Sequence, residues 1–567
     1  MITMNIAATI LSLFCSFIIT ILYFNKFDPF IAALIAVLFF WSINKVKGHL
    51  KLLEEKRIYI VAICICSIFA ISQVIGANID INEKKYNWFP LEVNILFFTV
   101  LFISSFIFFI LLILWYRHPV SEKTVKNQSY LSPKWVFGIL MFFWGMWYLV
   151  YMPGLAVGDS FNSIRMGLGD QKLQNHFPVF YTIFISACMK VGYSLFHNYN
   201  AGLAIYSLIQ MTSLAYLLTC IINKLNKYGM NQYVLTFIIA YYALSPAFGS
   251  YAITMWKDPI FSAMLTLFAL KLVFYIKEDT CEKAEILKCT LLLLGVCLLR
   301  NNGIYSLYVV MIAILFNKTL KKLLPAFIFT IAFISLWNFT IKKLDMDKDG
   351  FIESVGIPMQ QMASVVVHDG KIDTEDAKFL YHLLPKEEYK ELFNPFRVDE
   401  IKWANNFNLE YLNANKKEFF ITWFHLLKSN PKLYVKQYCM STIGFWHMGQ
   451  GLSYGEFGQV IIDNNYDIHF SKKFDEYLNR DLINLSNQKT KYIPIGILVW
   501  LGFFHGAVCL AIHKNAFIIP LFSLYSVWLT LMVGTPVAYG LRYLWVYALF
   551  VPIFIMYPKL VNTSYEK

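Results

Sequence analysis

One polar stretch in an otherwise apolar chain holds residues whose types and spacing could do chemistry. It runs from Tyr151 to Tyr181, YMPGLAVGDSFNSIRMGLGDQKLQNHFPVFY, and includes Asp159 and His176. A carboxylate near a membrane surface can accept a proton from a hydroxyl nucleophile. Asp159 is therefore our candidate general base, and His176 is a candidate for hydrogen-bonding a phosphate or a sugar.

Three more polar motifs each stand at the end of an apolar run. WKDP holds Lys257 and Asp258, LRNNG holds Arg300 and Asn302, and LRYLW holds Arg542. Ionisable groups at membrane depth are costly and usually face a cavity or a partner. Basic side chains in such a cavity could bind a phosphate and stabilise it as a leaving group. We therefore expect these residues and Asp159 to share one cavity.

Each of these residues also has a purely structural interpretation. Asp159 could cap a short helix, and Asp258 could pair with Lys257 and cap the helix that Pro259 begins. A single lysine or arginine at a membrane interface is often only an anchor. A lone loop histidine such as His176 is more often structural. It is the set of charges that points to a site.

The composition indicates a membrane protein. The 567 residues are 58% hydrophobic and only 15% charged, and the mean hydropathy is +0.52. A soluble domain has about a quarter charged residues. The net charge of +13 comes mostly from short basic loops between apolar runs, which is a topology signal, so no nucleic-acid partner is predicted. No cysteine and histidine spacing typical of zinc is present, and no metal ligand is predicted.

The apolar runs predict an all-α polytopic membrane protein with about fourteen transmembrane helices. They lie at about 5–24, 28–44, 58–77, 92–115, 135–151, 201–222, 231–249, 259–276, 286–299, 303–317, 322–340, 493–512, 516–534 and 541–558. Placing the basic loops inside puts both termini in the cytoplasm and the polar motifs outside. The run 178–196 is then an interfacial helix within an external loop, 152–200.

Four segments follow from this pattern. Residues 1–133 form a four-helix transmembrane extension, and residues 134–340 form a core with the external loop 152–200. Residues 341–492 form an extracytoplasmic, partly interfacial helical segment, and residues 493–567 contribute three last transmembrane helices. A stretch as long as 341–492 exceeds an ordinary loop. Within it, Gln361 in ESVGIPMQQ is a candidate for hydrogen-bonding a sugar, with an ordinary amphipathic helix as the alternative.

These motifs resemble the GT-C superfamily of integral-membrane glycosyltransferases, and within it a poorly characterised bacterial branch. The resemblance rests on the segments PGLAVGDSFNSI, NHFPVFYTIF, WKDPIF, LRNNGIY, LRYLW and ESVGIPMQQ. The resemblance implies a GT-C-like helical bundle in which Asp159 occupies the base position and Asp258 matches a second acidic residue. It also implies an inverting hexosyl or pentosyl transfer. In the superfamily the interfacial helix follows a His-Pro or Pro-Pro pair, whereas here Phe177 separates His176 from Pro178. No acidic pair stands beside Asp159, so a divalent metal stays open as a cofactor.

The predicted function is transfer of a sugar from a polyprenyl-phosphate donor to an extracytoplasmic acceptor at a bacterial cell membrane. The acceptor would be a cell-envelope glycan, lipid or polymer. The first alternative is an envelope polysaccharide polymerase or ligase, which also acts on lipid-linked glycans. The second is a lipid-linked glycan transporter, which predicts polar residues near the bilayer midplane and repeat symmetry. A cavity that joins Asp159, Asp258 and Arg300 would favour the transferase.

Overall fold

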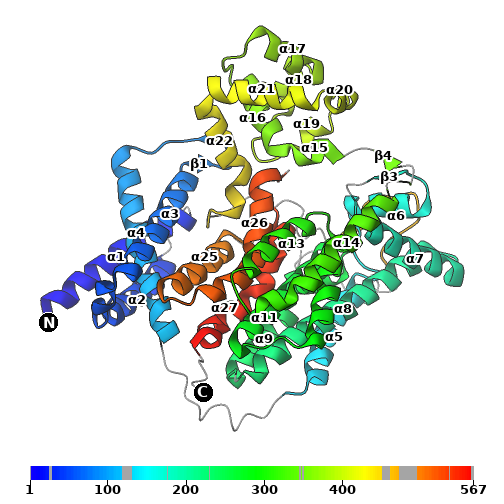
Figure 1. Ribbon diagram of the computed structural model, residues 1–567. Coiled ribbons are helices and arrows are strands. Elements are labelled where there is room, and N and C mark those ends of the chain that lie inside the picture. The colour runs from blue at the N-terminus through cyan, green and yellow to red at the C-terminus, as the bar shows by residue number, and fades with distance from the viewer. Residues whose placement is uncertain are drawn as a thin grey trace.

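The computed structural model is almost entirely α-helical (Figure 1). It describes residues 2–24, 29–117, 131–174, 177–228, 230–341, 343, 346–347, 350–449, 460–471, 495–535 and 537–562. The all-α prediction is confirmed. The described residues also form two short strand pairs. Strands β1 (Ile79–Asp80) and β2 (Lys85–Tyr86) pair antiparallel, and strands β3 (Leu173–Gln174) and β4 (Met346–Asp347) pair parallel.

Ten helical segments in the described part of the chain are long and apolar enough to cross a membrane. They are α2 (Pro29–Lys47), α3 (Lys56–Ala77), α4 (Leu91–Arg117), α5 (Pro133–Val150), α7 (Val179–Phe196), α8 (Tyr199–Lys227), α11 (Asp258–Glu278), α14 (Leu324–Ile341) with its preceding turn, α26 (Phe522–Gly534) with its preceding turn, and α27 (Trp545–Asn562) with its preceding turn. The pair α9 (Gln232–Leu244) and α10 (Pro246–Ile253), bent by 52°, makes an eleventh if it is one span.

The count is therefore lower than the fourteen predicted. Each predicted run does form helix, but several are short. The apolar parts of α1 (Ile2–Phe24), α13 (Gly303–Ile314) and α25 (Ile495–Ala511) are each under 18 residues, and α12 (Lys283–Leu299) has 17. Conversely, α7, predicted to be interfacial, meets the same length and composition criteria as the spans. Hydropathy along the chain marks apolar helices, but it does not fix where each helix begins and ends.

The two ends of the helical bundle differ in character, as α11 shows. This helix has 21 residues, which at 1.5 Å per residue is about 31 Å, close to the hydrocarbon thickness of a bilayer. Asp258 begins it at one end. At the other end, Lys277 lies over the Tyr228 ring, near Lys559 of α27. Helix α27 also runs between these two ends, because Arg542 lies in the short turn just before it.

The basic connectors gather at the second end. Arg117 pairs with Glu55 at 2.7 Å, and Arg57 contacts His513 Nδ1 at 2.6 Å. The α27 residue Tyr557 donates to the Phe517 carbonyl at 2.6 Å, which places this cluster beside the end of α27. The described basic residues Arg57, Arg117, Lys277 and Lys559 therefore lie at one end of the bundle, opposite the polar motifs.

An outer helical segment, residues 350–442, covers the end of the bundle opposite the C-terminus (Figure 1). It comprises α15 (Gly350–Ser354), α16 (Gly356–Val367), α17 (Thr374–Leu383), α18 (Lys386–Leu392), α19 (Asp399–Lys402), α20 (Leu409–Ala414), α21 (Lys416–Ser429) and α22 (Pro431–Thr442). It has its own buried core, which includes Met362, Leu380, Leu412 and Phe419. The predicted helical segment after residue 341 is thus a separately packed layer over the bundle.

Candidate functional site

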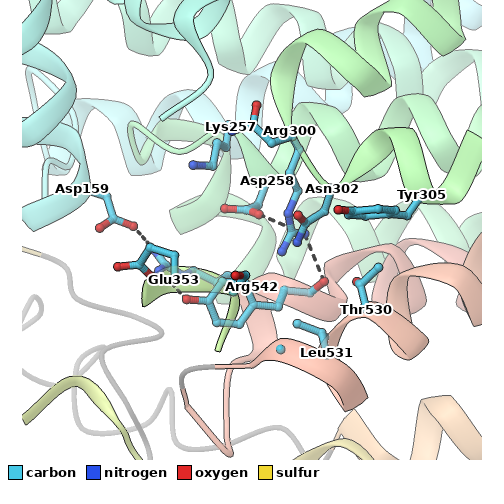
Figure 2. Close-up of a pocket in the computed structure, with 14 residues that line it drawn as sticks. Asp159, Lys257, Asp258, Arg300, Asn302, Tyr305, Glu353, Thr530, Leu531 and Arg542 are labelled. Atoms are coloured by element: carbon cyan, nitrogen blue, oxygen red, sulfur yellow. Dashed lines mark hydrogen bonds and ion pairs between the residues drawn. The ribbon is translucent and has the colours of Figure 1, made fainter. Parts of the chain in front are cut away.

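A polar cavity of about 370 Å³ lies at this covered end of the bundle (Figure 2). Small-molecule sites have volumes of about 300–1,000 Å³. The cavity is lined by Asp159, Lys257, Asp258, Arg300, Asn301, Asn302, Tyr305, Glu353, Ser354, Thr530, Leu531, Gly534, Arg542 and Tyr543. Six of the eight residues singled out from the sequence are among them. The cavity therefore joins segments that are distant in the sequence.

The polar loop after α5 is fixed in place by backbone pairing on both sides. Gly154 has φ of +136°, a conformation that residues with a side chain rarely adopt, and a Cβ there would also collide with Ser207. After this turn, Leu155 N donates to the Ile253 carbonyl at 3.1 Å, and Met255 N donates to the Leu155 carbonyl at 2.9 Å. On the other side, Ala156 pairs with Ile461. The loop thus lies alongside the segment that leads into α11.

This pairing brings Asp159 to the cavity. Asp159 lies in the first turn of α6 (Gly158–Leu168), whose N-cap is Val157. The Ser160 hydroxyl accepts from Val157 N at 3.1 Å and donates to the Met255 carbonyl at 2.9 Å. The capping interpretation of Asp159 is therefore wrong, because Val157 is the N-cap and Asp159 lies inside the first turn. A carboxylate in the first helical turn is still stabilised by the helix dipole.

Asp159 forms an ion pair with Arg542 from the other end of the sequence. Arg542 Nη1 donates to Asp159 Oδ2 at 2.7 Å, and Arg542 Nη2 donates to the Tyr543 hydroxyl at 2.8 Å. The guanidinium also lies over the Trp256 ring, 5.2 Å from its centroid. The Asp159 side chain remains 42% exposed. This carboxylate is held in one orientation while still open to a ligand.

A second ion pair is more deeply buried than the pair of Asp159 with Arg542. Arg300 Nη1 is 3.3 Å from Asp258 Oδ1, and both side chains are less than a tenth exposed. Arg300 also stacks on the rings of Phe261 and Tyr543. Asp258 is the first residue of α11 after the N-cap position and makes no side-chain cap there. The structural alternative for Asp258, capping and pairing with Lys257, is therefore wrong: its partner is Arg300.

Lys257 faces the cavity without an ion-pair partner within 4.0 Å among the residues that the structure describes. Its ammonium group lies over the ring of Phe177, 5.3 Å from the centroid. Burial lowers the pKa of Lys257, and the negative charges of Asp258 and Asp159 act in the opposite direction. A partly buried cation at a cavity wall is a favourable position for an anionic group of a ligand.

The sequence reasoning missed the contribution of Glu353. This residue enters the cavity from α15 of the outer helical segment, and Lys402 Nζ donates to its Oε2 at 2.6 Å. Lys402 is almost completely buried. The motif ESVGIPMQQ begins at Glu353, so the signal was present as the one charged residue of that motif, but we assigned the sugar contact to Gln361 instead.

Two of the candidate residues are not placed at the cavity. Gln361 is buried inside the outer helical segment, where it accepts from Trp423 Nε1 at 2.9 Å and donates to the Tyr434 carbonyl at 3.2 Å. It therefore belongs to the amphipathic helix α16, which was the alternative interpretation. His176 lies outside the described residues.

A comparison with protein families gives one match. The profile of a family of unknown function (DUF6020) matches residues 168–556. The chain belongs to this family. No curated protein and no solved structure matches the chain. The DUF6020 match includes Lys257, Asp258, Arg300, Glu353 and Arg542, whereas Asp159 and the first four helices precede it.

The cavity of this DUF6020 member balances opposite charges. Three acidic side chains, Asp159, Asp258 and Glu353, line it together with three basic ones, Lys257, Arg300 and Arg542. Among the described residues, these carboxylates do not form a group of three ligands close enough for one metal ion. Each instead faces a cation. Such an arrangement can bind an anion on the basic side chains while it presents a carboxylate to a hydroxyl group.

Proposed function

We propose that this chain is a membrane glycosyltransferase of the GT-C type. It transfers a sugar from a polyprenyl-phosphate donor to an extracytoplasmic acceptor such as a cell-envelope glycan, lipid or polymer. The observation that carries the proposal is the convergence of Asp159, Asp258, Arg300 and Arg542 on one cavity at the end of membrane-length apolar helices. A lipid-linked phosphate needs this combination of position and charge.

In the proposed reaction, the Asp159 carboxylate accepts the proton of the acceptor hydroxyl. The acceptor oxygen then forms a bond to the anomeric carbon of the sugar, with inversion. The bond from that carbon to the donor phosphate oxygen breaks, and the electron pair leaves with the lipid phosphate. Lys257, Arg300 and Arg542 stabilise the charge on this leaving group.

The ion pair between Arg542 and Asp159 fits this scheme. A donor phosphate would compete with Asp159 for the Arg542 guanidinium. Binding of the donor would therefore release the carboxylate next to the position where the acceptor hydroxyl must react. Asp258 is held by Arg300 in a buried pair, which suits a positioning role for Asp258 better than proton transfer.

The distribution of basic residues supports an extracytoplasmic cavity. Lysine and arginine are enriched in cytoplasmic loops of membrane proteins, and the basic connectors share the end of the bundle opposite the cavity. In the proposed topology both termini are cytoplasmic in a bacterial cell membrane, and α7 is an interfacial helix. Fourteen spans result when α1, α12, α13, α25 and the bent pair α9–α10 are each included.

The same geometry bears on the alternatives. A transporter requires polar groups near the bilayer midplane, whereas the charges that line the cavity lie at one end of α11 and α27. The buried pair of Lys271 with Glu285 lies further along α11, towards the opposite end. An envelope polymerase or ligase would also act on lipid-linked glycans, so it is separated from a monosaccharide transferase by its product. The size of the transferred unit decides between them.

The test is a comparison of envelope glycans and lipids from cells that carry the wild-type chain or its Asp159→Asn variant. We expect the variant to be made at wild-type levels and to lose the modification. Asp170→Asn, in the same loop but outside the cavity, is the matched control and should retain it. Normal modification in the Asp159→Asn cells would refute the assignment. A repeating oligosaccharide in place of a single sugar would favour the polymerase.

A further inference from the structure

Two helices of the outer helical segment present a cluster of possible metal ligands that the proposed cavity does not use. Asp373 and Asp376 come from the start of α17, and His425 comes from α21. One ligand atom of each residue lies within 4.8 Å of the others. His425 Nδ1 is 3.5 Å from Asp376 Oδ1. Figure 1 places α17 at the far end of the outer segment, away from the bundle.

Asp373 is the N-cap of α17, and its capping bonds leave part of the carboxylate available. The backbone N–H groups of Glu375 and Asp376 both donate to Oδ1, at 3.1 and 2.8 Å. These two bonds use a single oxygen of the carboxylate. The second oxygen is the one that could bind a ligand.

A fourth group points independently to a ligand at this position. Thr422 lies one helical turn before His425 on α21 and is completely buried. Its hydroxyl lies close enough to the Asp376 carboxyl group to act on it as a donor, but it makes no hydrogen bond of good geometry within the described part of the chain. Buried hydroxyl groups without a partner are rare, because losing the hydrogen bonds of water is costly.

We propose that Asp373, Asp376, Thr422 and His425 bind one divalent transition-metal cation of the zinc class. Two carboxylates and one imidazole form a ligand set that zinc accepts in a four-coordinate site, with the threonine oxygen as the fourth or outer ligand. The charge balance favours a cation. The two carboxylates carry a charge of −2, whereas the N-terminus of α17 contributes only about +0.5.

The site would join α17 to α21 and so tighten the outer helical segment. It goes beyond the proposed glycosyltransferase activity and does not depend on it. Because the four ligands come from two helices that are distant in sequence, the cation would bind only the folded segment. Binding should therefore raise the temperature at which this segment unfolds.

The experiment is calorimetric titration of the purified full-length chain in detergent, stripped of metal with a chelator, using ZnCl2 and then CaCl2. A second titration uses MnCl2, because manganese prefers oxygen ligands to thiolates and so should not bind to the ten cysteines. We expect one zinc site that is lost, or weakened at least about tenfold, in Asp376→Asn and in His425→Gln. Thr422→Val should weaken it less.

Two matched controls share the helix but not the cluster. Glu375→Gln lies between the two aspartates, and His382→Gln lies at the other end of α17; both side chains are exposed and both variants should bind zinc as the wild type does. The exposed position of His425 means that its variant should still fold, which gel filtration checks. Wild-type protein that binds no zinc, equal binding by Asp376→Asn and His425→Gln, or tighter binding of calcium than of zinc would each overturn the proposal.

Discussion

The ion pair between Lys402 and Glu353 connects the outer helical segment to the cavity, and its two partners should not be equally costly to remove. Lys402 Nζ lies 2.6 Å from Glu353 Oε2, and its side chain is 1% exposed. Glu353 is 18% exposed and lines the cavity. Asp399 is the other carboxylate near Lys402, at 3.9 Å. Water can therefore reach the carboxylate but not the ammonium group.

The two substitutions differ in which charge they leave behind. Glu353→Ala leaves a buried ammonium without its hydrogen-bond partner, and breaking a buried pair in this way costs about 3–5 kcal/mol. Asp399 remains, so we expect the lower limit, about 3 kcal/mol. Lys402→Met keeps the apolar stem packed and leaves a carboxylate that the cavity can hydrate. We expect that substitution to cost about 1 kcal/mol, the value of one net hydrogen bond.

Amide hydrogen exchange of α16 and α22 measures the free energy of opening the outer helical segment in both variants. Lys390→Met is the control, because the pair of Lys390 with Asp369 is exposed and such pairs contribute little. The double variant Glu353→Ala/Lys402→Met should resemble Lys402→Met, since no unpaired buried charge remains. If Lys402→Met costs as much as Glu353→Ala, the reasoning from unequal hydration is wrong.

Two further predictions concern the phosphate clamp and the pH dependence. Arg542→Met should weaken binding of a short-chain polyprenyl phosphate by about 10–100-fold, the value of a charge-assisted hydrogen bond, and should affect acceptor binding less. Arg165→Met, outside the cavity, is the control. Equal loss of affinity for both ligands in Arg542→Met would contradict a phosphate clamp. Burial alone would raise the pKa of Glu400, but hydrogen bonds led by that from Arg397 lower it below the ordinary 4.5. A carboxyl group with a lowered pKa stabilises the folded state fully above pH 4.5, and this contribution is lost as the pH falls through the folded pKa. In Glu400→Gln the free energy of unfolding should therefore depend less on pH below 4.5, by about 1 kcal/mol or less. Thermal unfolding measured over this pH range checks it, and the same pH dependence as in the wild type would contradict this role of Glu400.

The positions of the polar motifs were predictable because the membrane imposes a simple rule. Charged residues between apolar runs must lie near the ends of the helices, and the alternation of runs assigns each motif to one end. This reasoning placed Lys257, Arg300 and Arg542 together, and the cavity contains all three. It could not give the number of spans, because α12 and α13 have only 17 and 12 residues, and apolar runs of that length need not cross a bilayer.

The outer helical segment was harder to interpret from its sequence. Gln361 and Glu353 lie eight residues apart in one polar motif, and both could face a ligand. The fold separates them: Glu353 lies on α15 at the cavity, while Gln361 lies on α16 with its amide bonded to Trp423. Outside the membrane, polar residues have no depth constraint, so composition gives no rule for which of them face inward.

The sequence by itself determined that this chain is a bundle of apolar helices with a charged cavity at one end, because burying backbone and charge in hydrocarbon allows few other solutions. Only the tertiary structure decided the pairing within that cavity. Asp159 meets Arg542 across 383 residues of chain, and Asp258 meets Arg300 rather than its neighbour Lys257. The reason is physical: ion pairing depends on distance and orientation over a few ångströms, and these are fixed by how the helices pack, which no local pattern records.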